Sequence, residues 1–241
     1  QTSLTVYSLK HKRPVAINID RALVPRFDYR FTPEHGSVLA TAGPPSHYGI
    51  GGGYTPQVDG RGSGETLYGN AGPVTPGRND RCPRYEQEPD GGWSLDFNKS
   101  YVSLPRALVP PFASWEITMD VWPRNLSGTQ TLLGCDFTGF MLLLKNGVPT
   151  ASTYLNNNYE TNLPAQAVAT GPALRPDCWN RIRVRFDQHE LSVEVNGESG
   201  EKVKASGYQR YPRIFGLGAD QRRGNYFDGK IRSLQIKHQT P

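Results

Sequence analysis

Residues 115–122 read Trp-Glu-Ile-Thr-Met-Asp-Val-Trp, with a large apolar side chain at every second position from Trp115 to Val121. Successive side chains of a β-strand point to opposite faces of the sheet. The apolar residues of this stretch therefore share one face, while Glu116, Thr118 and Asp120 share the other. The pattern predicts a half-buried strand, with one face in a hydrophobic core.

The same alternation recurs in two later stretches. Residues 179–186 carry isoleucine, valine and phenylalanine on one face and three arginines on the other, and apolar residues alternate again over 191–195. A polar link joins the two stretches, and Asn196-Gly197 is a strong turn signal after the second. We expect a β-hairpin whose arginines face Glu194 across the strand pair, which explains the charges without a ligand.

Two other stretches predict strands with special features. Residues 140–144 form a continuous apolar run before Lys145-Asn146-Gly147, which is typical of a buried strand that enters an Asn-Gly turn. In residues 229–236 the apolar positions are 231, 234 and 236, so the strict alternation fails by one residue. A β-bulge near Ser233 would restore it.

Composition supports an all-β chain and excludes several functions. The 241 residues include 26 glycines and 20 prolines, which favours many turns over long helices. The net charge is +5, but lysine and arginine are dispersed and form no basic patch for nucleic acid. No apolar run is long enough to span a membrane. The three cysteines lack metal-site spacing. They form either one disulfide and one free thiol, or three buried thiols, and both alternatives stay open.

The chain divides into an N-terminal extension and one main domain. Residues 1–25 contain two short β-like runs, which predict either edge strands or the tail of a preceding domain. Residues 26–241 form the main domain, interrupted at 43–92 by an insertion rich in glycine and proline. Loops of that length are either functional or poorly ordered. The insertion lacks the Gly-Lys-Ser/Thr ending of a phosphate loop.

Several motifs occur in a familiar order. They are Trp93–Phe97 with Tyr101–Pro105, the strand from Trp115 to Pro123, Trp179–Val184 with Val195–Gly197, and Phe227–Ile231. This order over residues 93–238 resembles laminin-G-like modules of the concanavalin A-like lectin and glucanase superfamily. The resemblance implies an antiparallel β-sandwich of two sheets, of the jelly-roll type. Arg232 and Ser233 depart from the family, which often has acidic residues there.

The resemblance allows both enzymes and binding modules. A retaining glycosidase needs two carboxyl groups about 5–5.5 Å apart, and an inverting one needs roughly 6.5–9.5 Å. Glu116 and Asp120 share a face but are about 13 Å apart along the strand. We therefore expect a non-catalytic carbohydrate-binding or accessory module of an extracellular carbohydrate-active protein. The alternatives are a jelly-roll glycoside hydrolase or polysaccharide lyase, and a structural or protein-contact domain.

The expected partner is a glycan or polysaccharide, together with other domains of a parent chain. The expected location is secreted, periplasmic or at the cell surface. Sugar sites combine aromatic rings with amides and arginine forks. The candidate ligand-binding residues are Tyr154, Asn156, Asn157, Asn158 and Tyr159 in one loop and Arg222, Arg223 and Tyr226 in another. The resemblance places both loops near the same end of the sandwich. A polar loop without a ligand is the plainer interpretation of the first.

The resemblance also implies calcium, because many laminin-G-like domains hold it with loop oxygens. Calcium takes six to eight oxygen ligands. The candidate donors are Asp96, Asn98, Asp136, Asp220 and Asp228. They do not form a contiguous Asp-rich loop, so a calcium site would have to be assembled from separate loops.

Overall fold

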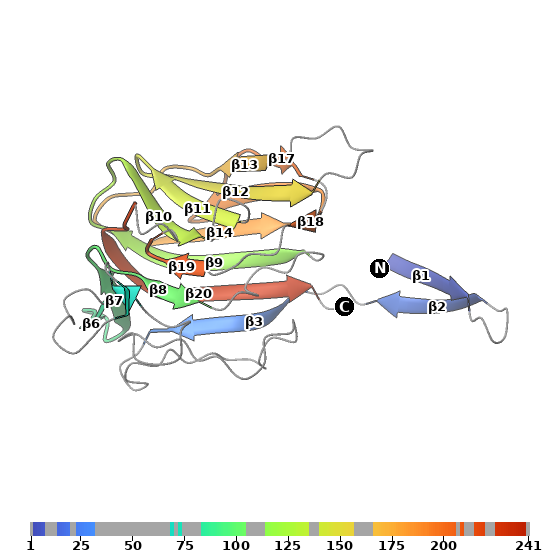
Figure 1. The fold of residues 1–241 in the computed structure, drawn as a ribbon, viewed down its shortest axis with the longest axis horizontal. Helices are drawn as coiled ribbons and strands as arrows, with labels where there is room; N and C mark the ends of the chain where they lie inside the picture. The colour runs from blue at the N-terminus through green and yellow to red at the C-terminus, as the bar shows by residue number, and fades with distance from the viewer. Residues whose placement is uncertain are drawn as a thin grey trace.

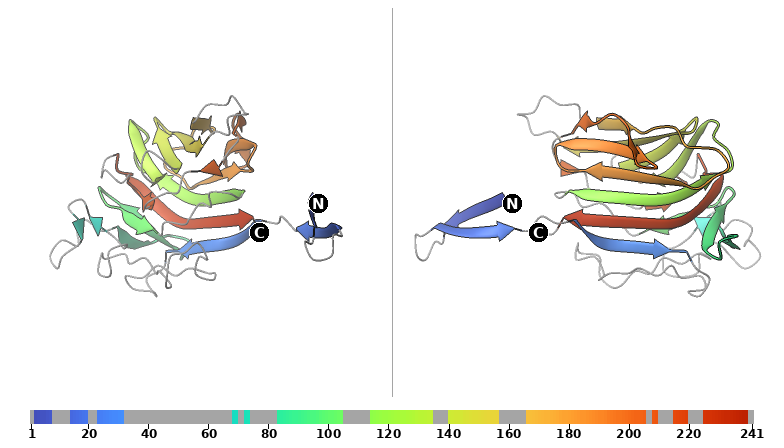
Figure 2. Two further views of the ribbon diagram at one scale, coloured as in Figure 1. Left: turned by 45° about the vertical axis from the view of Figure 1, so that its right-hand side comes forward. Right: turned by 180° about the vertical axis from the view of Figure 1, so that it is seen from behind.

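The structure is a computed structural model. It describes residues 2–7, 14–19, 23–31, 68–69, 72–73, 83–104, 114–134, 140–156, 166–205, 208–209, 215–219 and 225–239. The regular elements in these ranges are β-strands, β1 to β20. Two antiparallel sheets pack into a sandwich, so the predicted all-β fold class is confirmed (Figures 1 and 2).

The larger sheet has nine strands, in the order β16-β15-β14-β9-β20-β7-β6, with β17 paired to β15 and β3 paired to β20. Their bounds are Leu23–Arg30 for β3, Arg84–Gln87 for β6, Trp93–Phe97 for β7, Trp115–Pro123 for β9, Asn180–Phe186 for β14, Glu190–Val195 for β15, Glu198–Ser199 for β16, Val203–Lys204 for β17 and Gly229–Gln239 for β20. The chain's early strand β3 therefore lies beside its last strand β20 (Figure 2, right).

The smaller sheet has seven strands, in the order β13-β12-β11-β10-β19-β8, with β18 paired to β12. Their bounds are Val102–Leu104 for β8, Thr129–Gly134 for β10, Phe140–Lys145 for β11, Val148–Asn156 for β12, Gln166–Thr170 for β13, Tyr208–Gln209 for β18 and Phe215–Leu217 for β19. Two short hairpins form sheets of their own, β1 (Thr2–Tyr7) with β2 (Pro14–Ile19) and β4 (Tyr68–Gly69) with β5 (Gly72–Pro73).

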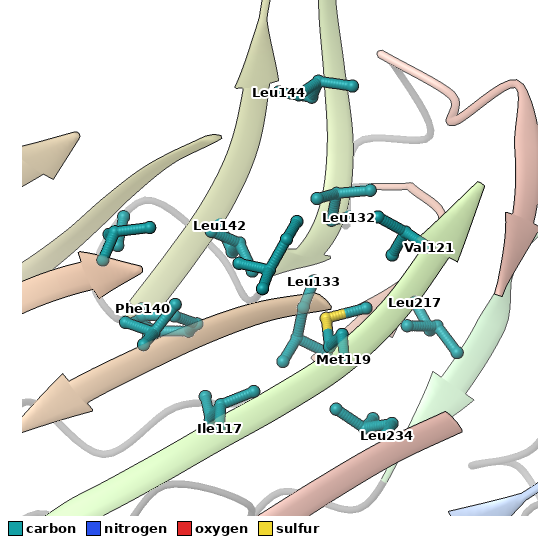
Figure 3. Close-up of a cluster of buried hydrophobic side chains, with 14 of the residues drawn as sticks. Ile117, Met119, Val121, Leu132, Leu133, Phe140, Leu142, Leu144, Leu217 and Leu234 are labelled. Atoms are coloured by element: carbon teal, nitrogen blue, oxygen red, sulfur yellow. The ribbon is translucent and has the colours of Figure 1, made fainter. Parts of the chain in front are cut away.

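The hydrophobic core lies between the two sheets (Figure 3). The alternate apolar residues of β9 are fully buried, as the sequence pattern predicts. The Trp115 ring packs edge-on against Phe140 of the smaller sheet, with ring centroids 5.1 Å apart, and against Phe186 of its own sheet at 5.7 Å. Such aromatic pairs bury large areas, and this one joins the two sheets.

Local features of the strands also follow the sequence. Asn146-Gly147 and Asn196-Gly197 adopt positive φ angles, of 47° and 80° in the first turn and 53° and 88° in the second. Asparagine and glycine tolerate this left-handed conformation, which tight hairpin turns require. The register of β20 shifts between Ile231 and Ser233, so the predicted bulge is confirmed.

Residues 140–144 form the predicted strand, which is β11 and enters the turn at Asn146-Gly147. The two faces of β11 differ in burial, because Phe140, Leu142 and Leu144 are fully buried whereas Met141 and Leu143 are half-buried. Only one face of β11 packs against the larger sheet. The other face of β11 belongs to the outer surface of the smaller sheet. Packing in the core therefore does not explain why Met141 and Leu143 on this face are apolar.

Candidate functional site

In its described part, the outer face of the smaller sheet consists mainly of uncharged side chains, with the exposed Lys145 at the end of β11 as a charged exception. In β12 the odd residues 151, 153 and 155 point into the core, so the even residues Thr150, Ser152 and Tyr154 point outward. Cross-strand neighbours share a face. We call this surface the neutral face and define it as Met141, Leu143, Thr150, Ser152, Tyr154, Gln166, Val168 and Thr170.

The neutral face combines apolar surface with hydroxyl and amide groups. Ser152 lies between Met141 on one neighbouring strand and Val168 on the other. Val168 is 42% exposed, whereas Tyr154 is half-buried and lies opposite Gln166. An aromatic ring beside apolar side chains and a few polar groups is the usual composition of a site for an uncharged, amphipathic ligand.

The first predicted ligand loop begins at this face. Tyr154 and Asn156 belong to the end of β12, whereas Asn157, Asn158 and Tyr159 lie outside the described residues. Here β18 pairs with β12, so that Tyr208 is the partner of Asn156 and Gln209 the partner of Leu155. The sequence analysis missed Tyr208, because nothing in the local pattern around residue 208 shows that it pairs with a strand fifty residues earlier.

Tyr226, the described residue of the second predicted ligand loop, does not lie at this end of the sandwich. Tyr226 follows Asn225, whose carbonyl accepts a hydrogen bond from the backbone N–H of Thr131, near the start of β10. Because β10 and β12 are both antiparallel to β11, they run in the same direction. Tyr226 therefore lies near the start of these strands and Tyr154 near their end. Arg222 and Arg223 lie outside the described residues.

The outer face of the larger sheet has the opposite character. We call it the charged face and define it by the outward side chains Glu116, Asp120, Trp122, Trp179, Arg181, Arg183, Arg185, Glu194, Lys230, Arg232 and Lys237. Arg183 donates to Glu194 at 2.6 Å, which confirms the expected cross-strand pairing, and Lys237 donates to Glu116 at 3.1 Å.

Asp120 is the centre of the charged face. Arg181 donates to both of its carboxylate oxygens, at 2.8 and 3.0 Å, and the Ser233 hydroxyl donates at 3.0 Å. Burial alone would raise the pKa of Asp120, but the bonds from Arg181 and Ser233 outweigh it and lower the pKa below its ordinary value. Asp120 therefore stays ionised, which is the wrong state for a general acid.

Two tryptophans of the charged face are covered by cations. The Lys230 ammonium lies 5.5 Å from the centre of the Trp122 ring, and the Arg232 guanidinium carbon lies 4.7 Å from that of Trp179. These distances are in the range of cation–π interactions. The same cations also pair with carboxylates: Lys230 with Glu86 at 2.7 Å and Arg232 with Asp90 at 3.4 Å. The indoles thus serve the internal packing of this face.

A pocket of about 170 Å³ opens on the charged face beside β15. Its ten lining residues include Glu116, Arg183, Arg185, Glu190 and Lys202, and none of the ten is aromatic. The pocket therefore offers charge but no ring on which a sugar could stack.

The predicted calcium donors are only partly described. Asp136 and Asp220 lie outside the described residues, and Asn98 is exposed. Asp96 and Asp228 lie close together, but the Arg124 guanidinium lies between them and donates to a carboxylate oxygen of each. In the described part of the chain, no group of three or more His, Cys, Asp or Glu residues could hold a metal ion. Asp96 and Asp228 therefore do not fit calcium while Arg124 lies between them.

Two further observations concern the cysteines and the presence of membrane-spanning helices. Cys178 is a free thiol, whereas Cys82 and Cys135 lie outside the described residues. Within the described ranges, no helix is long and apolar enough to cross a membrane.

The two-sheet sandwich with its closing strand β20 defines the class of protein, an antiparallel jelly-roll domain. The chain belongs to the concanavalin A-like lectin/glucanases superfamily, whose laminin-G-like family model matches residues 96–240. A comparison of the sequence with curated proteins found no match.

Among solved structures, the chain is similar to domain 4 of AbnA, a GH43 extracellular arabinanase from Geobacillus stearothermophilus, in complex with arabinotriose. The TM-score is 0.59 at 16% identity, over 92% of this chain and 96% of that one. The mouse laminin alpha1 domains LG4-5 match with a TM-score of 0.47 at 15% identity, over 66% of this chain and 43% of that one. At 16% identity, the likeness to the AbnA domain establishes the fold alone.

Proposed function

We propose that this chain is a non-catalytic carbohydrate-binding module of an extracellular carbohydrate-active protein, and that it binds glycan on the neutral face around Tyr154. The observation that carries this proposal is the neutral face, on which the half-buried Tyr154 lies opposite Gln166 and beside apolar side chains. Sugar rings have apolar faces that stack on aromatic rings and hydroxyls that hydrogen-bond to amides. The neutral face offers both.

The similarity to the AbnA domain supports this proposal, because that domain was solved with arabinotriose and matches nearly the whole chain. The amides of Asn156, Asn157 and Asn158 and the ring of Tyr159 would extend the site from the end of β12. Arg222, Arg223 and Tyr226 would then form a separate contact, because Tyr226 lies at the other end of the strands.

The absence of catalysis is part of the proposal. A glycosidase needs one carboxyl group that keeps its proton near neutral pH and a second group beside it. On the charged face, Glu116 and Asp120 bind cations at 3.1 Å or less, and the pKa of Asp120 is lowered. Asp120 is therefore not suited to donate a proton. The opposing candidate, a hydrolase or lyase, would have to use a pair of groups other than Glu116 and Asp120.

Calcium is not required at Asp96 and Asp228 in the proposed module, because Arg124 supplies the positive charge there. A calcium site that includes Asp136 and Asp220 stays a prediction. The proposed location is outside the cytosol, attached to other domains of a parent chain.

A glycan array with the purified 241-residue chain tests the function directly. The wild type should bind a defined set of oligosaccharides, and Tyr154→Ala should lower the affinity roughly tenfold, or about 1.4 kcal/mol. Tyr154→Phe keeps the ring and should retain most of the binding. The matched control is Trp179→Ala on the charged face, which should leave binding unchanged.

Three results would contradict the proposal. The first is a folded wild type that binds nothing on a broad array, which would favour a structural or protein-contact domain. The second is a loss of binding in Trp179→Ala but not in Tyr154→Ala, which would move the site to the charged face. The third is turnover of any bound oligosaccharide, which would make the chain an enzyme.

A further inference from the structure

Three strand segments meet at one corner of the larger sheet. Asp96 lies in β7, Arg124 directly follows β9, and Asp228 directly precedes β20. Gly229 pairs with both Pro123 and Phe97, so the ends of the three strands lie side by side. A Cβ atom at Gly229 would lie 2.3 Å from the Trp122 carbonyl oxygen. The absence of a side chain at Gly229 therefore permits this close approach.

The Arg124 guanidinium binds oxygen atoms from two of these segments. It donates to the carboxylates of Asp96 and Asp228 and, at 3.4 Å, to the backbone carbonyl of Phe97. Its own backbone N–H donates to the Asp228 carbonyl at 3.0 Å. Burial lowers the pKa of Arg124, but the two carboxylates outweigh burial and raise it. At this corner the Arg124 guanidinium is thus a permanent positive charge that is bound by carboxylate and carbonyl oxygens.

The loop after Arg124 is held in place independently of the guanidinium. The Gln130 side chain donates to the Asn125 carbonyl at 2.7 Å and to the Ser127 carbonyl at 3.3 Å, and its oxygen accepts from the Asp228 backbone N–H at 2.9 Å. Gln130 is buried. The backbone of Asp96 is held separately, by strand pairing with Lys230 and Arg84. We therefore expect the backbone positions of Asp96 and Asp228 to survive the loss of the Arg124 side chain.

We propose that Arg124 takes the place of a divalent cation at this corner, so that the wild type needs no metal here and removal of the guanidinium creates a calcium site. Calcium prefers carboxylate and carbonyl oxygens and completes its shell with water. Two carboxylates and the Phe97 carbonyl would provide up to five oxygens. The side chains of Asp96 and Asp228 are 28% and 43% exposed, so a metal ion and water can enter.

The test is thermal unfolding of the wild type and of Arg124→Gln, each with EDTA and with calcium chloride at about 5 mM, which is above the affinities of extracellular calcium modules. In EDTA, Arg124→Gln should unfold roughly 4 °C below the wild type. Calcium should restore at least half of that loss. The triple variant Arg124→Gln, Asp96→Asn, Asp228→Asn should shift with calcium no more than the wild type does.

The deciding quantity is the calcium-dependent shift in Arg124→Gln beyond that of the wild type. Because the wild type and Arg124→Gln both contain Asp136 and Asp220, the difference between their shifts excludes the contribution of any calcium bound at those residues. Arg183→Gln is the matched control, because Arg183 pairs with the single carboxylate Glu194 on the same sheet. The variant Arg183→Gln should show no calcium-dependent shift in unfolding temperature beyond that of the wild type.

Two results would overturn the proposal: no extra calcium response in Arg124→Gln, or an extra response that persists in the triple variant. If Arg124→Gln does not fold in EDTA, the readout becomes the yield of folded protein after refolding with and without calcium. A yield that calcium does not increase would then overturn the proposal. Neither result depends on glycan binding.

Discussion

The outer faces of the two sheets differ in how their polar groups are satisfied. On the charged face, arginines and lysines bind carboxylates on neighbouring strands, and two of these cations also cover tryptophan rings. The eight side chains that define the neutral face are apolar, hydroxyl or amide groups, with the charged Lys145 only at the edge where β11 ends, and Val168 is 42% exposed. A face whose groups already have partners gains little from a ligand, whereas an apolar side chain exposed to water, such as Val168, does gain.

This difference separates stability from function. Substitutions on the charged face should mainly change the free energy of unfolding, because they break contacts within the chain. Substitutions on the neutral face should mainly change glycan binding. The expected effects can be ranked by how buried each group is and by how many partners it has.

The largest effect is expected at Asp120, which is 7% exposed and binds Arg181 and Ser233. Asp120→Asn should lower the free energy of unfolding by about 2 kcal/mol at pH 7, because the arginines lose their charged partner. Urea denaturation of both proteins measures the change. Glycan affinity should be unaltered, and a tenfold loss of affinity would mean that the charged face binds the ligand.

The Asp120 effect should depend on pH in a defined direction. The folded-state pKa of Asp120 is lowered from 3.8, so its contribution is complete above the unfolded-state pKa. The contribution shrinks as the pH falls below 3.8 and disappears below the folded-state pKa. The stability difference between wild type and Asp120→Asn should follow this course in unfolding curves recorded from pH 7 to acid. A difference that is constant over the range would contradict it.

A charge placed on the neutral face tests the other half of the comparison. Val168→Lys should reduce glycan affinity roughly tenfold, because it places an ammonium group on the apolar surface. Its free energy of unfolding should change by less than about 0.5 kcal/mol, since the position is exposed. Glu198→Lys, at an exposed position of β16, is the control that should leave affinity unchanged. Equal losses in both variants would indicate a general charge effect instead.

The smallest effect is expected at Glu194. Its partner Arg183 has a side chain that is 45% exposed, so solvent screens the pair. Glu194→Gln should cost about 0.5 kcal/mol or less in urea denaturation. A cost near that of Asp120→Asn would show that the charged face acts as one cooperative network, not as separate pairs.

The strands and their turns could be predicted from the sequence because their causes are local. Alternation over 115–122 and 179–186 and the two Asn-Gly turns depend only on residues next to one another. The bulge near Ser233 follows from a break in one strand's own pattern. The strand from residue 140 was also predicted, but the smaller burial of its second face was not, because that burial depends on what packs there.

The candidate site was only partly predictable. Tyr154 was identified from composition, and the amides that follow it stay predictions. Tyr208 was missed and Tyr226 was placed at the wrong end of the sandwich, because both depend on strand pairing and direction across the sheet. The Arg124 corner was missed for the same reason, since Asp96, Arg124 and Asp228 are far apart in the chain.

The sequence by itself determined the all-β class, the strand periodicity, the turns and the superfamily. Each of these depends on side-chain spacing along a single segment. Only the tertiary structure decided which face is charged and self-paired, which is neutral, and which cation lies between Asp96 and Asp228. Those properties depend on the register between strands distant in the chain, and register is a product of the packed sandwich.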